Sequence, residues 1–156
     1  MKATSDHELE QEVIVHCFVT VFIKKGAKEK MIARTLAGLV GGLMLLNCFW
    51  WILDPASAAE SLSMPLLLGL ESNSQIGDFT SFFFTAGLFA CIGAYRAEHV
   101  WLYPTISLIG SAAFFRSYAV FAHGSEPLVP TIIFEIVIST ILIFCVLLMK
   151  KNSDLH

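Results

Sequence analysis

The sequence predicts an all-α, polytopic membrane protein in which four transmembrane helices form a bundle. Two observations on the 156-residue chain support this fold class. The chain is 56% hydrophobic and only 15% charged, with a mean hydropathy of +0.70, as is typical of membrane proteins rather than soluble domains. Several apolar runs also reach the roughly 20 residues that a helix needs to cross a bilayer. These runs are continuous, which excludes the shorter, alternating strands of a membrane barrel.

The first thirty residues are predicted to be a cytoplasmic segment (1–30) that contains an amphipathic, interfacial helix. The stretch 13–23 is apolar but has only about half the length of a span. Polar side chains recur at every fourth position along it: Glu12, His16, Thr20 and Lys24. One narrow polar stripe beside a broad apolar face favours a helix that lies on the membrane. The alternative is that translation starts at Met31, so that residues 1–30 are not part of the protein.

The remaining chain is predicted to be a transmembrane domain (31–150) with a short cytoplasmic tail (151–156). The four helices are expected at about 32–53, 76–95, 100–122 and 128–149. Pro55 ends the first helix, because the residue before a proline disfavours helical geometry. In the loop that follows, Ser57 and Glu60 have the spacing of a capping box and predict a short helix over 58–62. The apolar residues that follow this helix in the sequence either cap the bundle or simply tether the short helix to the second span.

The basic residues predict the orientation, because short loops rich in Lys and Arg stay in the cytoplasm. The segments 54–75 and 123–127 contain no Lys or Arg. Nine basic residues share the other side of the four-helix topology: Lys2, Lys24, Lys25, Lys28, Lys30, Arg34, Arg96, Lys150 and Lys151. We therefore expect a multi-pass protein of the cell (inner) membrane with a cytoplasmic N-terminus and a cytoplasmic C-terminus.

Small residues predict how the helices pack, because close approach in lipid uses a small side chain at every fourth position. The candidate helix-packing glycines are Gly38, Gly41, Gly42, Gly87 and Gly110. Most of these positions are expected to form seams within the bundle. The alternative is a homodimer that forms through the face shared by Gly38 and Gly42.

Two full charges, Arg116 and Glu135, lie inside the third and fourth predicted spans. An ionised side chain at the centre of a membrane helix costs roughly 2.5–3.5 kcal/mol, so such residues are usually paired and turned inward. Helix rise places both charges about 10 Å from the same membrane surface, and we expect them to meet. Asp78 is predicted to lie closer to that surface, while Ser139 and Thr85 extend the polar site toward the interior.

The segment "FFRSYAVFAHGSEP", followed by "FEIV", resembles uncharacterised bacterial four-helix membrane proteins that share a domain of unknown function. Those proteins are similar in an Arg near the end of the third helix, a Gly and a Pro in the next turn, and a Glu inside the fourth helix. The matching positions are Arg116, Gly124, Pro127 and Glu135. The resemblance covers roughly 31–149 and implies the four-helix architecture, but no activity.

The patterns of common enzymes are missing from the sequence, so we expect no catalytic residues. No HExxH, GxSxG or Walker pattern occurs, and no Lys lies in a span to form a Schiff base. The four cysteines are scattered singly and lack metal-ligand spacing. We therefore expect no cofactor and no metal, and nothing in the sequence indicates a nucleic-acid partner.

Two functions from different classes remain. The first is a non-enzymatic accessory or scaffold protein in which the Arg-Glu(-Asp) site fixes neighbouring helices, since removing one partner of a buried pair costs about 3–5 kcal/mol. The alternative is a membrane binding protein or transporter for a lipid headgroup, a small polar molecule or protons. The expected partners are membrane lipids and either a larger membrane protein or a second copy of the chain. The sequence does not distinguish a structural Arg116–Glu135 pair from a functional one.

Overall fold

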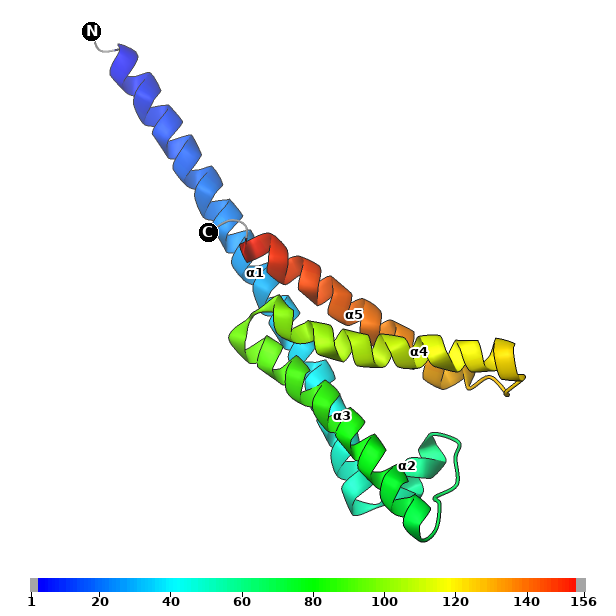
Figure 1. Ribbon diagram of the computed structural model, residues 1–156. Coiled ribbons are helices and arrows are strands. Elements are labelled where there is room, and N and C mark those ends of the chain that lie inside the picture. Colours follow the sequence, from blue (N-terminus) through cyan, green and yellow to red (C-terminus); the bar gives the residue numbers. More distant parts are fainter. Residues whose placement is uncertain (1–2, 154–156) are drawn as a thin grey trace.

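The computed structural model describes the backbone of residues 3–153 and the side chains of residues 28–151 (Figure 1). Its elements are α1 (Ala3–Leu53), α2 (Pro55–Ser61), α3 (Leu70–Arg96), the 3-10 helix η1 (His99–Leu102), α4 (Tyr103–His123) and α5 (Val129–Ser153). The described part of the chain contains no strand. Four stretches are long and apolar enough to cross a membrane: Lys28–Leu53, Leu70–Arg96, His99–His123 and Val129–Lys151. The prediction of an all-α membrane protein with four spanning helices is confirmed.

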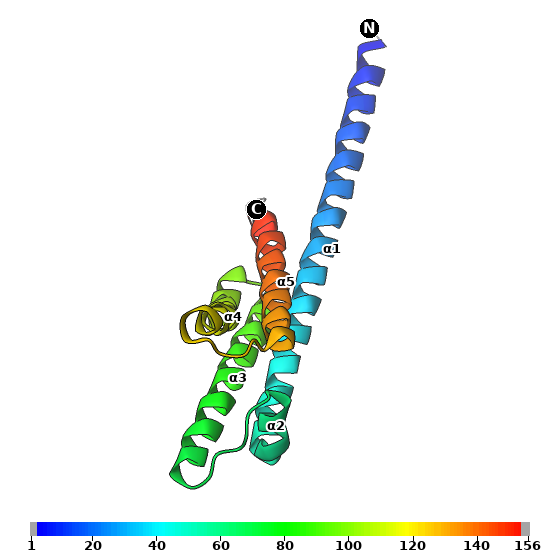
Figure 2. The same ribbon diagram turned by 90° about the vertical axis from the view of Figure 1, so that its right-hand side faces the viewer.

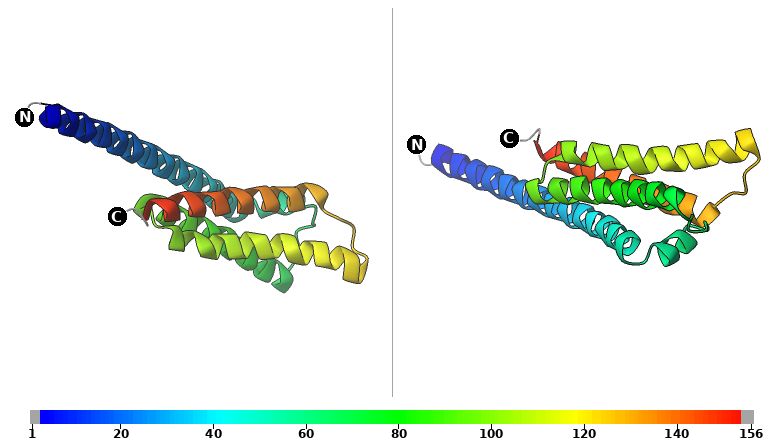
Figure 3. Two further views of the ribbon diagram at one scale, coloured as in Figure 1. Left: turned by 90° about the horizontal axis from the view of Figure 1, so that it is seen from above. Right: turned by 60° about the horizontal axis from the view of Figure 1, so that its bottom comes forward.

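The separate N-terminal interfacial helix is not confirmed. Helix α1 runs without a break from Ala3 to Leu53, so the predicted interfacial segment and the first span belong to one helix. No proline interrupts α1, and Gly26, the one glycine before the first span, costs a helix only about 1 kcal/mol. Figure 3 shows the N-terminal half of α1 projecting beyond the other helices. The side chains of the predicted polar stripe lie outside the part of the chain whose side chains are described.

Helix α3 begins six residues earlier than the sequence predicts, at Leu70 rather than residue 76. The additional turns are polar, so an apolar-length criterion misses them. Gln75 lies in these turns and fastens the preceding loop to α3. Its Oε1 accepts a hydrogen bond from the Leu67 backbone N–H (2.9 Å), and its Nε2 donates to the Pro65 carbonyl (3.2 Å). The loop therefore caps the bundle and is not a loose tether.

The predicted short helix in this loop exists, but Asp54 rather than Ser57 caps it. Helix α2 begins at Pro55, and Asp54 Oδ1 accepts a hydrogen bond from the Ser57 backbone N–H (3.2 Å). A proline fits the first position of a helix because the N–H that it lacks would have no partner there. The capping box predicted from Ser57 and Glu60 is wrong by one turn, because Pro55 can begin a helix as well as end one.

The cap makes α2 sensitive to pH. The Ser57 hydroxyl and backbone N–H hold the pKa of Asp54 below its ordinary value of 3.8. The stabilisation of α2 is therefore complete above pH 3.8, and it is lost as the pH falls below 3.8 through the folded-state pKa. We expect the protection factor of the Ser57 amide against hydrogen exchange to fall in that range. Asp54→Ala should lower it above pH 3.8, and the difference from the wild-type protein should shrink as the pH falls below that value, whereas Glu60→Ala, on an exposed side chain of the same helix, should leave it unchanged.

Helix α3 runs antiparallel to the C-terminal half of α1, and the two form the most extensive helix pair of the bundle, whereas the N-terminal half of α1 extends beyond α3 (Figure 2). Their backbones approach most closely at Gly41 and Gly87. A β-carbon on Gly41 would lie 2.8 Å from the Cys91 backbone nitrogen, and one on Gly87 would lie 2.9 Å from the Gly41 carbonyl oxygen. Only glycine at both positions allows this contact. The seam predicted from the small residues is therefore present between the first two spans.

The other predicted packing glycines differ from this pair. A β-carbon on Gly38 would lie 3.6 Å from the Ala94 side chain, which is ordinary contact within the bundle. A β-carbon on Gly42 would meet nothing within 4 Å. One on Gly110 would lie 3.7 Å from Ser139 Oγ, so Gly110 allows α4 to approach α5 there. The predicted homodimer through Gly38 and Gly42 stays a prediction.

Helix α5 lies against α1 and α4. The contact between α3 and α4 is much smaller than the contact between α3 and α1. The Thr105 hydroxyl, near the beginning of α4, donates a hydrogen bond to the Ala86 carbonyl of α3 (2.8 Å), and both residues are fully buried. Beyond this junction α3 and α4 diverge (Figure 1). The two helices therefore leave space between them in the half of the bundle that carries α2.

The two ends of the bundle carry opposite charge. The end that carries α2 and the α4–α5 loop, called here the acidic end, has no described Lys or Arg; its charged residues are Asp54, Glu60, Glu71, Asp78 and Glu126. The other end, called the basic end, carries Lys28, Lys30, Arg34, Arg96, Lys150 and Lys151, with Glu29 and Glu98. An ion pair between Lys151 and Glu29 (3.2 Å) joins α5 to α1 at the basic end.

Candidate functional site

Arg116 and Glu135 form an ion pair between α4 and α5. The Arg116 Nε–H donates a hydrogen bond to Glu135 Oε1 at 3.0 Å. The Glu135 side chain is 9% exposed and that of Arg116 is 27% exposed. The carboxylate therefore lies inside the protein, and the guanidinium partly reaches open space. The structure brings together the two charges that helix rise places at equal depth.

A tight turn between α4 and α5 sets the register of this pair. Gly124 ends α4 in the left-handed conformation (φ 66°), and its N–H donates to the Val120 carbonyl (3.2 Å). Glycine adopts this conformation without the steric cost that a β-carbon brings. Helix α5 then begins within a few residues, at Val129. Because the connection is short, Arg116 and Glu135 lie at similar distances from it and face each other.

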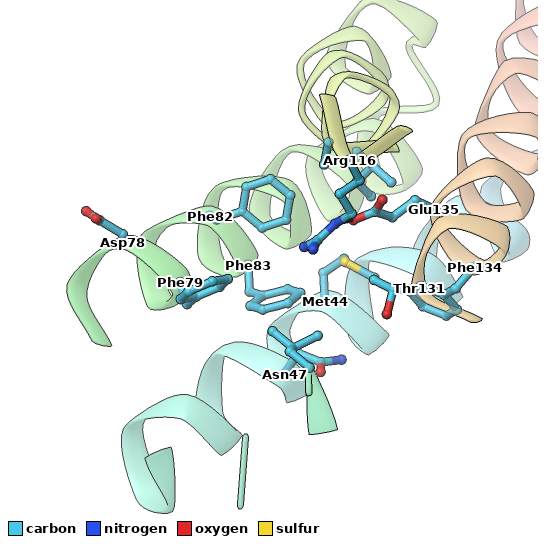
Figure 4. Close-up of a pocket in the computed structure, with 13 residues that line it drawn as sticks. Met44, Asn47, Asp78, Phe79, Phe82, Phe83, Arg116, Thr131, Phe134 and Glu135 are labelled. Carbon is cyan, nitrogen blue, oxygen red and sulfur yellow. Dashed lines mark hydrogen bonds and ion pairs between the residues drawn. The ribbon is translucent and has the colours of Figure 1, made fainter. Parts of the chain in front are cut away.

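The pair borders a pocket of about 320 Å³, which is near the lower limit of typical ligand sites (Figure 4). Residues from every long helix and from the end of α2 contribute to it. Its apolar lining consists of Met44, Leu62, Phe79, Phe82, Phe83, Ile109, Ala112 and Phe134, and its polar lining consists of Asn47, Asp78, Arg116, Thr131 and Glu135. The pocket is therefore a largely apolar, aromatic space with a small number of polar groups, as ligand sites usually are.

The free donors of Arg116 face this pocket. Its hydrogen bond to Glu135 uses Nε, and no other partner of the guanidinium occurs among the described residues. Figure 4 shows the terminal nitrogens of Arg116 directed into the space between Phe82, Phe83 and Met44. A guanidinium presents its N–H groups as a planar fork that matches an oxyanion. The geometry thus directs an oxyanion-binding fork into an apolar pocket.

Two further buried polar atoms near the pair lack partners in the described part of the chain: Glu135 Oε2 and Ser139 Oγ. Other hydroxyls on these helices donate to a backbone carbonyl one turn earlier, as Thr140 does to Ile136 (2.7 Å) and Ser117 to Ala113 (2.9 Å). The hydroxyl of Ser139 does not. Buried polar groups are normally satisfied, so these two atoms keep unused hydrogen-bonding capacity beside the ion pair.

The remaining predicted site residues are not part of the ion pair. Asp78 lines the mouth of the pocket and is exposed, and Figure 4 shows its carboxylate directed away from Arg116. Thr85 is half-buried and does not line the pocket. The Thr80 hydroxyl, which no pattern in the sequence singles out, is buried without a partner among the described residues.

The aromatic lining is the part of the site that sequence reasoning missed. Phe79, Phe82 and Phe83 lie on one face of α3, and Phe134 adjoins Glu135 on α5. The spacing of the three α3 residues is that of a single helix face, so a signal was present in the sequence. It was not distinctive, because phenylalanines also face lipid, as the 49% exposed Phe84 does.

Comparison with known proteins adds no identification. No family model, curated protein or solved structure matches this chain. The resemblance to uncharacterised bacterial four-helix membrane proteins therefore stays an expectation from the motifs. A functional conclusion must come from the pocket itself.

Proposed function

We propose that this chain is a non-enzymatic membrane protein that binds the polar headgroup of an amphiphile in the pocket of Arg116 and Glu135. The observation that carries the proposal is the orientation of Arg116. Its terminal nitrogens face a largely apolar pocket, and they have no acceptor among the described residues. A cation of this kind is costly in a membrane helix, so its free donors favour a role in recognition.

The surroundings of Arg116 support strong binding of an oxyanion. Charge-assisted hydrogen bonds are about twice as strong as neutral ones, and a surface of low polarity reduces their competition with water. Phe82, Phe83 and Met44 supply such a surface, and Met44 is only 1% exposed. The apolar walls would also hold the first carbon atoms of an amphiphile behind its headgroup.

Access from the bilayer fits the arrangement of the helices. The pocket is bordered by α3 on one side and by α4 and α5 on the other, and α3 and α4 diverge in this half of the bundle (Figure 1). A headgroup therefore enters between these helices without crossing the bundle. We further propose that the protein lies in the cell (inner) membrane with the basic end and both termini in the cytoplasm.

The role as an accessory or scaffold subunit is the second candidate. The observation that favours it is the ion pair itself, which joins α4 to α5 and requires no ligand. That role predicts co-purification with a larger membrane protein in mild detergent. Transport of protons or solutes is less well supported, because the Thr105 hydroxyl, deeper in the bundle, is bonded to Ala86 and unavailable as a relay.

The binding proposal is tested by mass spectrometry of the protein gently released from membranes. We expect the wild-type protein to retain a lipid or another amphiphile in stoichiometric amount. Arg116→Gln should reduce retention at least about tenfold, because the charge-assisted hydrogen bonds are lost. Arg116→Lys keeps the charge but not the planar fork, so it should reduce retention by a smaller factor.

The matched control is Arg96→Gln, which removes the same charge from an exposed arginine at the basic end. It should leave retention unchanged. The proposal is wrong if the wild-type protein retains no small molecule. It is also wrong if both Arg116 variants retain the molecule as well as the wild-type protein does. Should Arg116→Gln fail to fold, Arg116→Lys alone decides the question, since it preserves the ion pair with Glu135.

A further inference from the structure

The charge balance of the pocket restricts the kind of headgroup that it can take. In its interior the negative charge of Glu135 cancels the positive charge of Arg116, since Glu135 Oε1 lies 3.0 Å from Arg116 Nε. The other residues of the lining are uncharged except Asp78 at the mouth. A ligand with a net negative charge would leave an uncompensated charge in a medium of low dielectric constant, which is unfavourable. A ligand with equal and opposite charges would not.

The free donors of Arg116 require that one end of the ligand be an oxyanion. Both terminal nitrogens of the guanidinium face the pocket, and phosphate and carboxylate groups accept a pair of hydrogen bonds from this fork. Glu135 does not compete for these donors, because it accepts from Nε. The Arg116 side of the pocket is therefore suited to the anionic part of a headgroup.

The mouth of the pocket requires the opposite charge. Asp78 lines the mouth with an exposed carboxylate, and Phe79 lies one position further along α3. The surrounding acidic end carries five carboxylates and no described Lys or Arg: Asp54, Glu60, Glu71, Asp78 and Glu126. Such a surface attracts cations and repels anions, and an ammonium group also interacts favourably with the face of an aromatic ring. A purely anionic headgroup has no counterpart here.

We infer that the Arg116 pocket selects a zwitterion of the phosphoethanolamine type over a headgroup that is only anionic. The phosphate binds the terminal nitrogens of Arg116, and the ammonium group points toward the mouth, where the negative field of Asp78 and the acidic end attracts it without a direct contact. This inference rests on the proposed function and specifies its ligand. The chemistry is shared by a phosphatidylethanolamine in the bilayer and by free phosphoethanolamine, and the experiment distinguishes these sources.

The test uses the full chain in nanodiscs with equal amounts of phosphatidylethanolamine and phosphatidylglycerol. Bound lipid is released with the protein and quantified by mass spectrometry. We expect the wild-type protein to enrich the zwitterionic lipid at least about tenfold over the anionic one, since a unit of uncompensated charge is involved. Glu135→Gln makes the interior of the pocket net positive, and it should shift this ratio at least about tenfold toward phosphatidylglycerol.

A second variant keeps the test decisive if Glu135→Gln does not fold. Asp78→Asn removes an exposed charge at the mouth and should reduce the enrichment about two- to fivefold, as is usual for exposed pairs. Glu60→Gln is its matched control: this exposed carboxylate also belongs to the acidic end but does not line the pocket. The control should leave the ratio unchanged.

Addition of free phosphoethanolamine identifies the source. If it displaces the bound lipid, the small molecule shares the site; if it does not, the headgroup binds only as part of a lipid, and either result supports the inference. Equal or preferential retention of phosphatidylglycerol by the wild-type protein would overturn the inference. If that retention still required Arg116, the proposed function would stand, whereas retention of neither lipid and of no other amphiphile would overturn the proposed function as well.

Discussion

Gly41→Ala and Gly87→Ala are each expected to destabilise the bundle by about 3 kcal/mol, near the upper end of the usual cost of overpacking. A β-carbon at Gly41 would lie 2.8 Å from the Cys91 nitrogen and 3.0 Å from the Gly87 carbonyl oxygen. These are backbone atoms, so no side chain can rotate to relieve the clash. The two helices must separate, and the contact that organises the other helices is then lost.

Gly42→Ala is the matched control, since it makes the same change at the next position of α1. A β-carbon there meets nothing within 4 Å, and alanine favours a helix over glycine by about 1 kcal/mol. We expect unchanged or slightly increased stability, measured by unfolding in mixtures of mild and denaturing detergent. If Gly42→Ala were as harmful as Gly41→Ala, Gly42 would face a partner outside the described bundle, and the predicted homodimer would gain support.

This contrast shows what the sequence could and could not predict about packing. Gly38, Gly41 and Gly42 belong to the same small-residue region of one helix, so spacing alone identifies a close approach but not the glycine that makes it. The choice depends on the rotation of α1 against α3. That rotation is a tertiary property, determined jointly by the side chains of both helices.

The spans and the ion pair could be predicted because each depends on length or depth alone. Apolar length locates four helices, and equal distance from a short loop places Arg116 and Glu135 at one level. The shape of the pocket follows from another cause. It exists because α3 and α4 diverge beyond Thr105, and no local pattern determines an angle between helices (Figure 1).

The sequence also does not predict that α1 is one continuous helix. Residues 24–30 contain lysines and Gly26, which indicate a boundary between membrane and water. A change of solvent is not a break in the helix, because lysine is a good helix former and one glycine is tolerated. Composition therefore predicts where a span ends but not where its helix ends.

Breaking the ion pair is expected to have the largest effect on stability, and the effect should be unequal on its two sides. Arg116→Met leaves the Glu135 carboxylate, 9% exposed, without its countercharge and should cost about 3–5 kcal/mol. Glu135→Gln should cost about 1–3 kcal/mol, because the glutamine oxygen still accepts from Nε and the guanidinium, 27% exposed, is only partly desolvated. Unfolding in mixed detergents measures both values.

The double variant, Arg116→Met with Glu135→Gln, separates a structural role from a binding role. Since neither charge then remains, at least half of the stability lost in Arg116→Met should return, which is the coupling that a double-mutant cycle measures. Retention of an amphiphile should not return, because the donors that face the pocket are absent. If the double variant regained stability and also bound its ligand like the wild-type protein, Arg116 would be an architectural residue. Recovered stability with lost binding would show that one ion pair holds α4 to α5 and also positions the guanidinium for a ligand.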